Sequence, residues 1–272
     1  MPFALGAITD EIAPEMEQAL EVMVSEGIRL AELRTVFGRN VLELDDTQAR
    51  RALTMVRAAG CTVSGVASPV GKSPLGAPRE TEERRLGRAL ELAALLETDR
   101  IRIFSYYPEP GQTAAQLAAL APEVCQRLER LSALAATHGV TLLLENEVDL
   151  WGDVPERCRQ LLATVDSPHL RFAWDPANFV RSGVAAPQDA GWSLLAPWVA
   201  CAHVKDCDAQ GVHTVAGRGA GQWPQLLRDL EGQGGVPLIL EPHLRLAGRS
   251  EGFSGPDAFR QAVSALRQLL PA

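Results

Sequence analysis

The sequence contains little cysteine, and its cysteines show no binding pattern. Among the 272 residues there are 5, an odd number without the C-x-x-C spacing of a zinc knuckle. They are Cys61, Cys125, Cys158, Cys201 and Cys207. Such a set fits reduced thiols better than a disulfide framework. We therefore expect small core side chains at these positions.

The chain also lacks an excess of positive charge and any long apolar run. A net charge of −8 and a sequence pI near 5.2 argue against a broad basic surface for nucleic acid. No apolar stretch reaches transmembrane length, and MPFALGAITDE enters a strand-like segment without a basic leader or a cleavage site. These absences predict a cytoplasmic protein that acts on a small polar molecule, with no nucleic-acid or membrane partner.

Only one stretch of any length is rich in proline and glycine. Ser68–Pro78 (SPVGKSPLGAP) lies between a strand-like run and a helix-like run, so we expect a long loop and a candidate lid rather than a linker. Lys72 is a candidate contact of that lid, although a solvated lysine is the simpler interpretation. Nothing marks a domain boundary, which predicts one domain over residues 1–272.

Short apolar runs alternate along the chain with longer segments of helical periodicity. The predicted strands are Ala4–Ile8, Arg29–Leu33, Thr62–Ala67, Arg100–Phe104, Thr141–Glu145, Leu170–Trp174, Val199–Val204 and Pro237–Glu241. The predicted helices include Met16–Glu26, Thr47–Ala59, Thr81–Leu96, Ala114–Thr137, Pro155–Val165, Trp223–Leu230 and Pro256–Leu270. Glycine recurs where helix gives way to strand, as in left-handed C-terminal caps, at Gly27, Gly60, Gly139 and Gly235.

Eight such units in one domain of about 250 residues predict an α/β fold, the single-domain (β/α)8 TIM barrel. A doubly wound open sheet is the structural alternative. No G-x-G-x-x-G follows the first strand, and GRGAG at Gly217–Gly221 follows a polar loop, so a dinucleotide site has little support.

Four apolar runs in the second half of the chain end on a metal-ligand residue type. They are TLLLE to Glu145, LRFAWD to Asp175, VACAH to His203 and PLILE to Glu241. Parallel strands of a barrel build the active site at their carboxyl ends, so these side chains are expected to meet there. Each has a structural explanation by itself, as a strand cap, an ion pair, a turn residue before proline or a core histidine. Together they favour a shared cation.

Three carboxylates and one imidazole form a harder ligand set than a structural zinc site. One divalent metal ion is therefore expected as the cofactor. Mn²⁺ is our first choice, and Mg²⁺, Co²⁺ and Zn²⁺ are the alternatives.

Several motifs carry a family resemblance along nearly the whole chain. They are ITDEIAP, GIRLAELR, LLLENE, WDPANF, HVKD, GRGAG and LILEPH. In these motifs the chain resembles the sugar phosphate isomerase/epimerase group of the xylose isomerase-like TIM barrels. The resemblance assigns the four metal ligands to the residues above and the acid/base pair to Glu145 and Glu241. It implies proton abstraction next to a carbonyl through an enediolate.

The chain departs from the epimerase pattern at two positions. Asn178 stands where relatives carry a histidine, and it can bind a hydroxyl but cannot titrate near neutrality. Ala209 stands where an arginine is expected, and Lys205 is the candidate replacement. Arg34 and His243 are further candidate substrate contacts at the barrel mouth, although an arginine at a strand end also commonly pairs with carboxylates.

Trp151 and Trp174 are candidates for an apolar floor under a sugar ring, with packing beneath the loops as the alternative. The resemblance also extends to apurinic endonucleases, but 5 histidines are too few for a trinuclear zinc site.

We therefore predict a metal-dependent isomerase or epimerase of a small keto-sugar or related polyol. A dehydratase or lyase acting on a keto-inositol or 3-keto-sugar is the second hypothesis. A non-catalytic sugar-binding barrel is the third. Barrels of this kind often pair through their loops, so a homodimer stays open.

Overall fold

Eight parallel strands close into a barrel in the computed structural model, which describes residues 3–244 and 253–270. Their order around the ring is β1, β12, β9, β8, β7, β6, β5, β2, and β1 pairs in parallel with both β12 and β2. Their bounds are β1 Leu5–Ile8, β2 Leu30–Leu33, β5 Thr62–Ala67, β6 Arg100–Ile103, β7 Thr141–Glu145, β8 Leu170–Trp174, β9 Val199–Val204 and β12 Leu238–Leu240.

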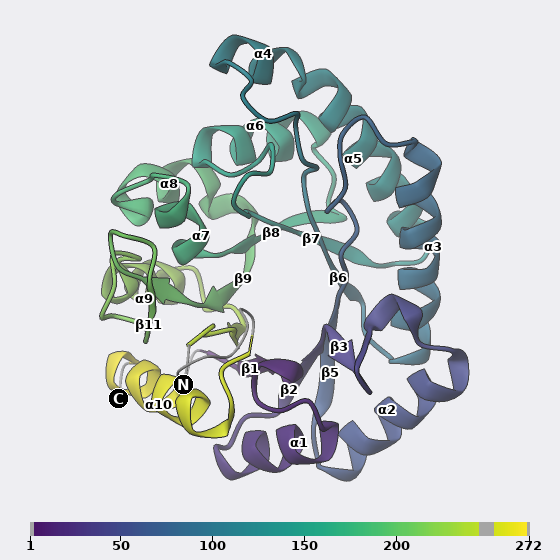
Figure 1. Cartoon of the computed structure of the whole chain (residues 1–272), viewed down its shortest axis with the longest axis vertical. Helices are drawn as coiled ribbons and strands as arrows, with labels where there is room; N and C mark the ends of the chain where they lie inside the picture. The colour runs from purple at the N-terminus through teal and green to yellow at the C-terminus, as the bar shows by residue number, and fades with distance from the viewer. Residues whose placement is uncertain (1–2, 245–252, 271–272) are drawn as a thin grey trace.

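Helices surround the ring of strands (Figure 1). The α-helices are α1 Met16–Ser25, α2 Asp46–Ala58, α3 Arg79–Leu95, α4 Ala114–Ala119, α5 Ala121–Ala136, α6 Pro155–Val165, α7 Pro176–Arg181, α8 Pro187–Leu195, α9 Trp223–Gly232 and α10 Pro256–Leu269. The 3₁₀ helices are η1 Thr9–Glu11, η2 Val41–Glu43 and η3 Ala196–Trp198. Two short hairpins follow β2 and β9, namely β3 Thr35–Val36 with β4 Arg39–Asn40, and β10 Asp206–Cys207 with β11 His213–Thr214.

The predicted single-domain (β/α)8 barrel is confirmed. Pairing of β1 with β12 joins the first and last barrel strands, which rules out the open doubly wound sheet. The predicted domain bounds of 1–272 extend beyond the described residues and stay a prediction.

The strands are buried on both faces, which explains their continuous apolar sequences. In β7, Leu142 and Leu144 join the main core, whereas Leu143 belongs to a separate small cluster with Ala173 and Cys201. Side chains two residues apart share a face of a strand. Two positions later along each chain segment come Glu145, Asp175 and His203, which therefore point to the same side. They are three of the predicted metal ligands.

Two helical regions differ from the prediction. The expected helix Ala114–Thr137 is two helices, α4 and α5, which meet at Leu120, with Pro122 in the first turn of α5. Proline tolerates a helix start but not a helix interior, so the chain restarts there. The short helices α7 and α8 were not among the predicted ones. The predicted glycine caps are confirmed, since all four glycines have positive φ angles.

The predicted lid loop between β5 and α3 is tied to the loop that follows β6. The Tyr107 N–H donates to the Ser73 carbonyl at 2.9 Å, and the Leu75 N–H donates to the Tyr107 carbonyl at 2.8 Å. Gly71 has φ +83°, and a Cβ there would lie 2.1 Å from the Phe104 carbonyl oxygen. These contacts make the loop a fixed wall of the barrel mouth in this structure.

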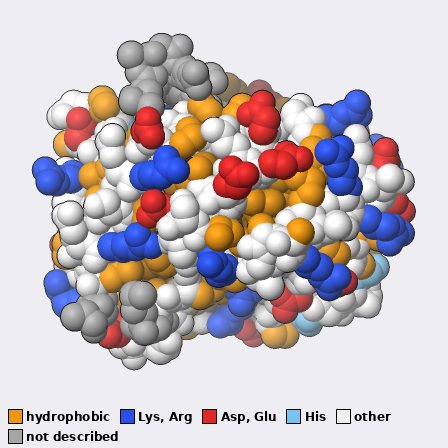
Figure 2. All heavy atoms as spheres, turned by 90° about the horizontal axis from the view of Figure 1, so that it is seen from below, with side chains coloured by type: hydrophobic (Ala, Val, Ile, Leu, Met, Phe, Trp, Pro, Cys, Tyr) orange, Lys and Arg blue, Asp and Glu red, His pale blue; other side chains and the backbone are white. Residues whose placement is uncertain are grey.

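The face seen from the side of α1 carries charged side chains of both signs between apolar patches (Figure 2). It shows no continuous basic field. Among the described residues, no helix has the length and apolarity to cross a membrane. All five cysteines are buried and free, as expected for core thiols.

Candidate metal centre

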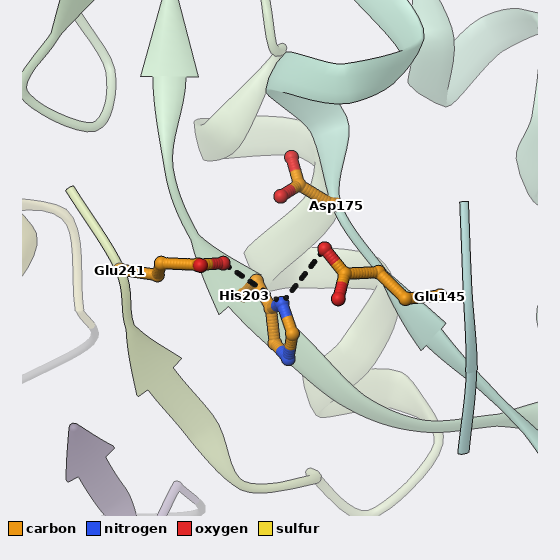
Figure 3. Close-up of side chains that lie close together, drawn as sticks. All are labelled: Glu145, Asp175, His203 and Glu241. Atoms are coloured by element: carbon orange, nitrogen blue, oxygen red, sulfur yellow. Dashed lines mark ion pairs between the residues drawn. The ribbon is translucent and has the colours of Figure 1, made fainter. Parts of the chain in front are cut away.

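Four side chains from neighbouring strands surround one point at the carboxyl end of the barrel (Figure 3). Glu145 ends β7, Asp175 directly follows β8, His203 lies in β9 and Glu241 directly follows β12. All four are buried, and each offers a ligand atom that lies within 4.8 Å of the other three. These residues are called the four-residue cluster below. The strands thus bring together all the metal ligands that the sequence predicted.

The two glutamates approach the imidazole of His203 from opposite sides (Figure 3). The Nδ1 atom of His203 lies 3.4 Å from Glu145 Oε1 and 3.2 Å from Glu241 Oε2. Asp175 lies on a third side of the same centre. The ligand atoms of these side chains therefore lie close enough together to hold a single cation.

The donor atoms test whether a cation would fit. Among the described residues, one buried atom of each cluster member makes no hydrogen bond, namely Glu145 Oε2, Asp175 Oδ2, His203 Nδ1 and Glu241 Oε2. Buried polar atoms normally have such a partner. Ion pairs with neighbouring cations compensate them only in part. A set of carboxylate and imidazole atoms that converges in this way fits Mn²⁺, Mg²⁺, Co²⁺ or Zn²⁺.

The protonation of the cluster follows from its neighbours, because burial opposes charge on every member. Burial disfavours the imidazolium, but the charge of the Glu145 carboxylate raises the pKa of His203 well above its ordinary value. Burial also disfavours the Glu145 carboxylate, yet the charges of His203 and Arg102 lower the pKa of Glu145 to about 2. The glutamates therefore stay ionised and attract positive charge.

Lys205 supplies a buried cation beside the cluster. Its Nζ lies 2.8 Å from Asp175 Oδ2 and 3.6 Å from Glu241 Oε2. Burial acts against its charge, but Asp175 and Glu241 raise the pKa of Lys205 above its ordinary value. We therefore assign Lys205 as a protonated donor.

Asn178 contacts Glu145 directly. The Asn178 amide donates to Glu145 Oε1 at 3.3 Å and to the Asn146 carbonyl at 2.9 Å. Asn146, which the sequence did not single out, exchanges two hydrogen bonds with the Asp175 backbone, at 2.7 and 2.9 Å. Both asparagines thus orient members of the four-residue cluster. A polar residue directly after the strand-ending Glu145 was the available signal for Asn146.

Arg34 and His243 meet on the outer side of Glu241. Arg34 Nη1 lies 2.9 Å from Glu241 Oε1, and His243 Nε2 lies 3.3 Å from the same oxygen. Glu11 joins them, because its Oε1 lies 3.2 Å from Arg34 Nη2 and 3.1 Å from His243 Nε2. Glu11 lies in the ITDE motif, but the sequence alone predicted no role for it. Its signal was an acidic residue soon after the first strand.

Arg102 is a second residue that sequence reasoning missed. It lies in β6 with only 6% of its surface exposed, and its Nη1 is 3.3 Å from Glu145 Oε2. Its guanidinium also packs over the Phe104 ring, with 4.8 Å between Cζ and the ring centroid. An arginine within an apolar strand was the signal. It neutralises the side of Glu145 that faces away from Asn178.

Neither tryptophan forms the expected floor for a sugar ring. Trp151 is 1% exposed, and its indole N–H donates to the Leu117 carbonyl at 2.8 Å. Trp174 is fully buried and packs edge to face against Phe172 and Phe179. The strand explains this, since Trp174 must point away from the side taken by its neighbour Asp175. Packing, the alternative for both residues, is what the structure shows.

The glycine-rich GRGAG loop surrounds a carboxylate of the chain itself. Oδ2 of Asp206 accepts hydrogen bonds from the backbone N–H groups of Gly217 and Gly219, both at 2.9 Å. Its Oδ1 accepts another from Gly221 at 2.9 Å. A Cβ at Gly219 would lie 2.3 Å from Asp206 Oδ1, so the close approach requires glycine. The loop therefore positions the segment after Lys205 and is no dinucleotide cradle.

A cavity of about 520 Å³ opens next to the cluster. Its lining residues are Asp10, Arg34, Thr35, Lys72, Tyr107, Glu147, Val148, Asp149, Arg181, Lys205, His213 and His243. Three predicted substrate contacts, Arg34, Lys205 and His243, therefore reach it. Lys72 of the fixed loop also lines the cavity and pairs with Glu147 at 2.8 Å. This charged, concave space suits a small polar ligand.

The sequence profile described as xylose isomerase-like TIM barrel matches residues 19–271. The chain belongs to this family. A search of curated proteins gives no match for this xylose isomerase-like barrel.

Solved structures share the fold of this xylose isomerase-like barrel at low sequence identity. A D-psicose 3-epimerase from Clostridium cellulolyticum H10 is 16% identical, with a TM-score of 0.76 over 99% of this chain and 100% of that chain. A 3-keto-D-glucoside 4-epimerase from E. coli is 15% identical, with a TM-score of 0.70 over 98% of each chain. A probable 3-DHS dehydratase from Bacillus anthracis is 18% identical, with a TM-score of 0.67 over 91% and 92%.

Proposed function

We propose that the protein is a divalent-metal-dependent isomerase or epimerase of a small keto-sugar or related polyol. The convergence of the four-residue cluster, with two glutamates on opposite sides of its centre, carries this proposal (Figure 3). The structural likeness to a D-psicose 3-epimerase and a 3-keto-D-glucoside 4-epimerase supports the substrate class.

The cluster residues Glu145, Asp175, His203 and Glu241 would hold the cation, with Mn²⁺ as the first choice. When bound, the cation polarises a substrate carbonyl and stabilises the negative charge of an enediolate. Arg34, Lys205 and His243 line the cavity, and each is a donor for substrate oxygens. Asn178 acts on the protein side, because its amide orients Glu145.

Glu145 and Glu241 are the proton-transfer pair. One ionised carboxylate removes the proton next to the carbonyl, and the other takes up a proton from water and gives it to the enediolate from the opposite side. Return to the other face of the same carbon gives an epimer, whereas return to the neighbouring carbon gives an isomer. The protonated Lys205 and Arg34 keep Glu241 ionised, which a general base requires.

A dehydratase is the second candidate, supported by the likeness to a probable 3-DHS dehydratase. The same proton abstraction followed by loss of a β-hydroxyl would give that reaction. The product of turnover separates the two candidates.

Proton exchange in D₂O tests the proposal. The Mn²⁺-loaded protein is incubated with a panel of ketoses, inososes and 3-keto-glycosides, quenched with chelator and examined by ¹H NMR. We expect deuterium next to the carbonyl, at a rate that Glu241→Gln lowers by about 100-fold or more. Glu231→Gln, on the exposed face of α9, is the matched control and keeps the rate. No exchange with any compound despite bound metal would contradict the proposal and favour the non-catalytic sugar-binding barrel.

A further inference from the structure

A second cavity adjoins the one beside the four-residue cluster. It measures about 670 Å³, against about 520 Å³ for the first. Tyr107 and Asp149 line both cavities, so they form the boundary between them. Tyr107 follows β6 and Asp149 follows β7, the strand that ends in Glu145. The two cavities therefore lie on either side of these two residues.

The two cavities differ in the chemistry of their walls. Charged side chains dominate the first, whereas prolines and leucines beside Tyr107 dominate the second, among them Pro74, Pro108, Pro110, Leu117 and Leu150. The second cavity is also lined by Glu109, Gln112 and the ion pair of Asp153 with Arg157. A sugar ring has the same division, because its C–H faces pack on apolar and aromatic side chains while its hydroxyl groups need polar partners.

The second cavity is already formed in this structure. Backbone hydrogen bonds on both sides of Tyr107 tie its segment to the fixed loop after β5. On the opposite side, the Leu117 carbonyl of α4 accepts the indole N–H of Trp151 at 2.8 Å. The Arg157 guanidinium donates to the Trp151 carbonyl at 2.6 Å. A site held by such contacts can bind a ligand without the entropy cost of ordering its loops.

We infer that the second cavity is a subsite for a second sugar ring, so that the substrate is a glycoside of a keto-sugar and not a free monosaccharide. The inference rests on the proposed function for the chemistry at the first ring. Binding of the second ring needs no turnover, so the subsite can be tested separately.

Calorimetry on the full Mn²⁺-loaded chain tests the subsite with unreactive probes. Methyl β-D-glucoside is the one-ring probe, and cellobiose, maltose and trehalose are the two-ring probes. We expect at least one two-ring probe to bind about tenfold more tightly than the one-ring probe, in line with stacking on Tyr107. Equal affinity of all four probes would overturn the inference.

Two pairs of variants locate the gain in affinity. Leu117→Trp fills the second cavity, whereas Ala115→Trp places the same side chain on an exposed position of α4. Tyr107→Ala removes the ring at the boundary, and Tyr107→Phe keeps it. We expect Leu117→Trp and Tyr107→Ala to abolish the two-ring preference and the two controls to retain it. A loss of equal size for both kinds of probe would overturn the inference.

Failure of the subsite and failure of the proposed function give different results. A two-ring preference without deuterium exchange in any keto-sugar would support the subsite and contradict the proposed reaction. Exchange at equal kcat/KM for one-ring and two-ring keto-sugars, with equal affinities of the probes, would support the reaction and overturn the subsite.

Discussion

The two halves of the barrel carry different side chains at or near the carboxyl ends of their strands. The strands β7, β8, β9 and β12 bring the four-residue cluster together, so the candidate metal-ligand atoms converge on that side. The strands β1, β2, β5 and β6 contribute no member of the cluster. They bring the guanidinium groups of Arg34 and Arg102, which contact Glu241 and Glu145 respectively.

This difference teaches that the candidate ligands come from one half of the barrel, whereas both halves supply the groups that orient them. The second half adds Lys205 and Asn178, and the first half adds the guanidinium groups that contact Glu241 and Glu145. Variants in the two halves should therefore fail in different ways.

The largest expected effect is on metal affinity when a donor of the second half is lost. Asp175→Ala and His203→Ala each remove one donor, and we expect Mn²⁺ binding to weaken by at least about 100-fold, more than the loss of an outer contact. Arg34→Lys is the counterpart in the first half and should change Mn²⁺ affinity far less while raising KM. Calorimetry with Mn²⁺ measures both. An equal loss of Mn²⁺ affinity in Arg34→Lys would contradict the proposed difference between the two halves of the barrel.

Removal of the buried guanidinium under Glu145 should have the next largest effect. Arg102→Met leaves the Glu145 carboxylate without its cationic partner on that side, so we expect kcat/KM to fall by about 10- to 100-fold. Arg102→Lys keeps the charge and should restore part of the rate. Steady-state kinetics on a substrate found by deuterium exchange measure kcat/KM for both variants. Unchanged kinetics in Arg102→Met would show that β6 has no role in orienting Glu145.

The fixed loop of the first half can be tested by a pair of alanine substitutions. Gly71→Ala forces a Cβ against the Phe104 carbonyl at a positive φ, so we expect a loss of about 3 kcal/mol in the free energy of unfolding. Gly76→Ala, in the same loop, meets nothing within 4 Å among the described atoms and should change it by less than about 0.5 kcal/mol. Urea unfolding measures both values, and equal values would mean that the loop is not held at Gly71.

The smallest expected effect is the pH dependence of metal binding in the second half. Because its neighbours raise the pKa of His203, the imidazole is protonated below that pKa and must lose a proton to bind a cation. Apparent Mn²⁺ affinity should therefore rise with pH, by about tenfold per pH unit for one released proton, and level off above the pKa of His203. Calorimetry in buffers of different ionisation enthalpy counts the protons. An affinity that falls with rising pH would contradict this sign.

The sequence predicted the second half of the barrel better than the first. The cluster residues follow uninterrupted apolar runs, and the carboxyl ends of parallel strands always lie together, so local pattern was enough. Glu11 could not be assigned in this way. Its partner His243 lies 232 residues away and reaches it only because β12 closes against β1. Contacts made by closure of the ring leave no local pattern.

Side-chain direction accounts for the remaining differences. Trp174 and Asp175 are neighbours, so the inward direction of the aspartate sends the indole outward into the aromatic core. The prediction weighed each tryptophan by itself and did not use this alternation. Arg102 was missed for a related reason, because a buried arginine becomes useful only when the side of the strand that faces Glu145 is known.

The Asp206 carboxylate inside the GRGAG loop gives that loop a permanent ligand. Because the carboxylate belongs to the same chain, its effective concentration at the loop exceeds that of any dissolved anion that competes for the same N–H groups. Phosphate in the buffer should therefore not bind this loop and should not raise the melting temperature by doing so. This glycine-rich turn resembles a phosphate-binding site, but in this protein a carboxylate of the same chain already occupies it.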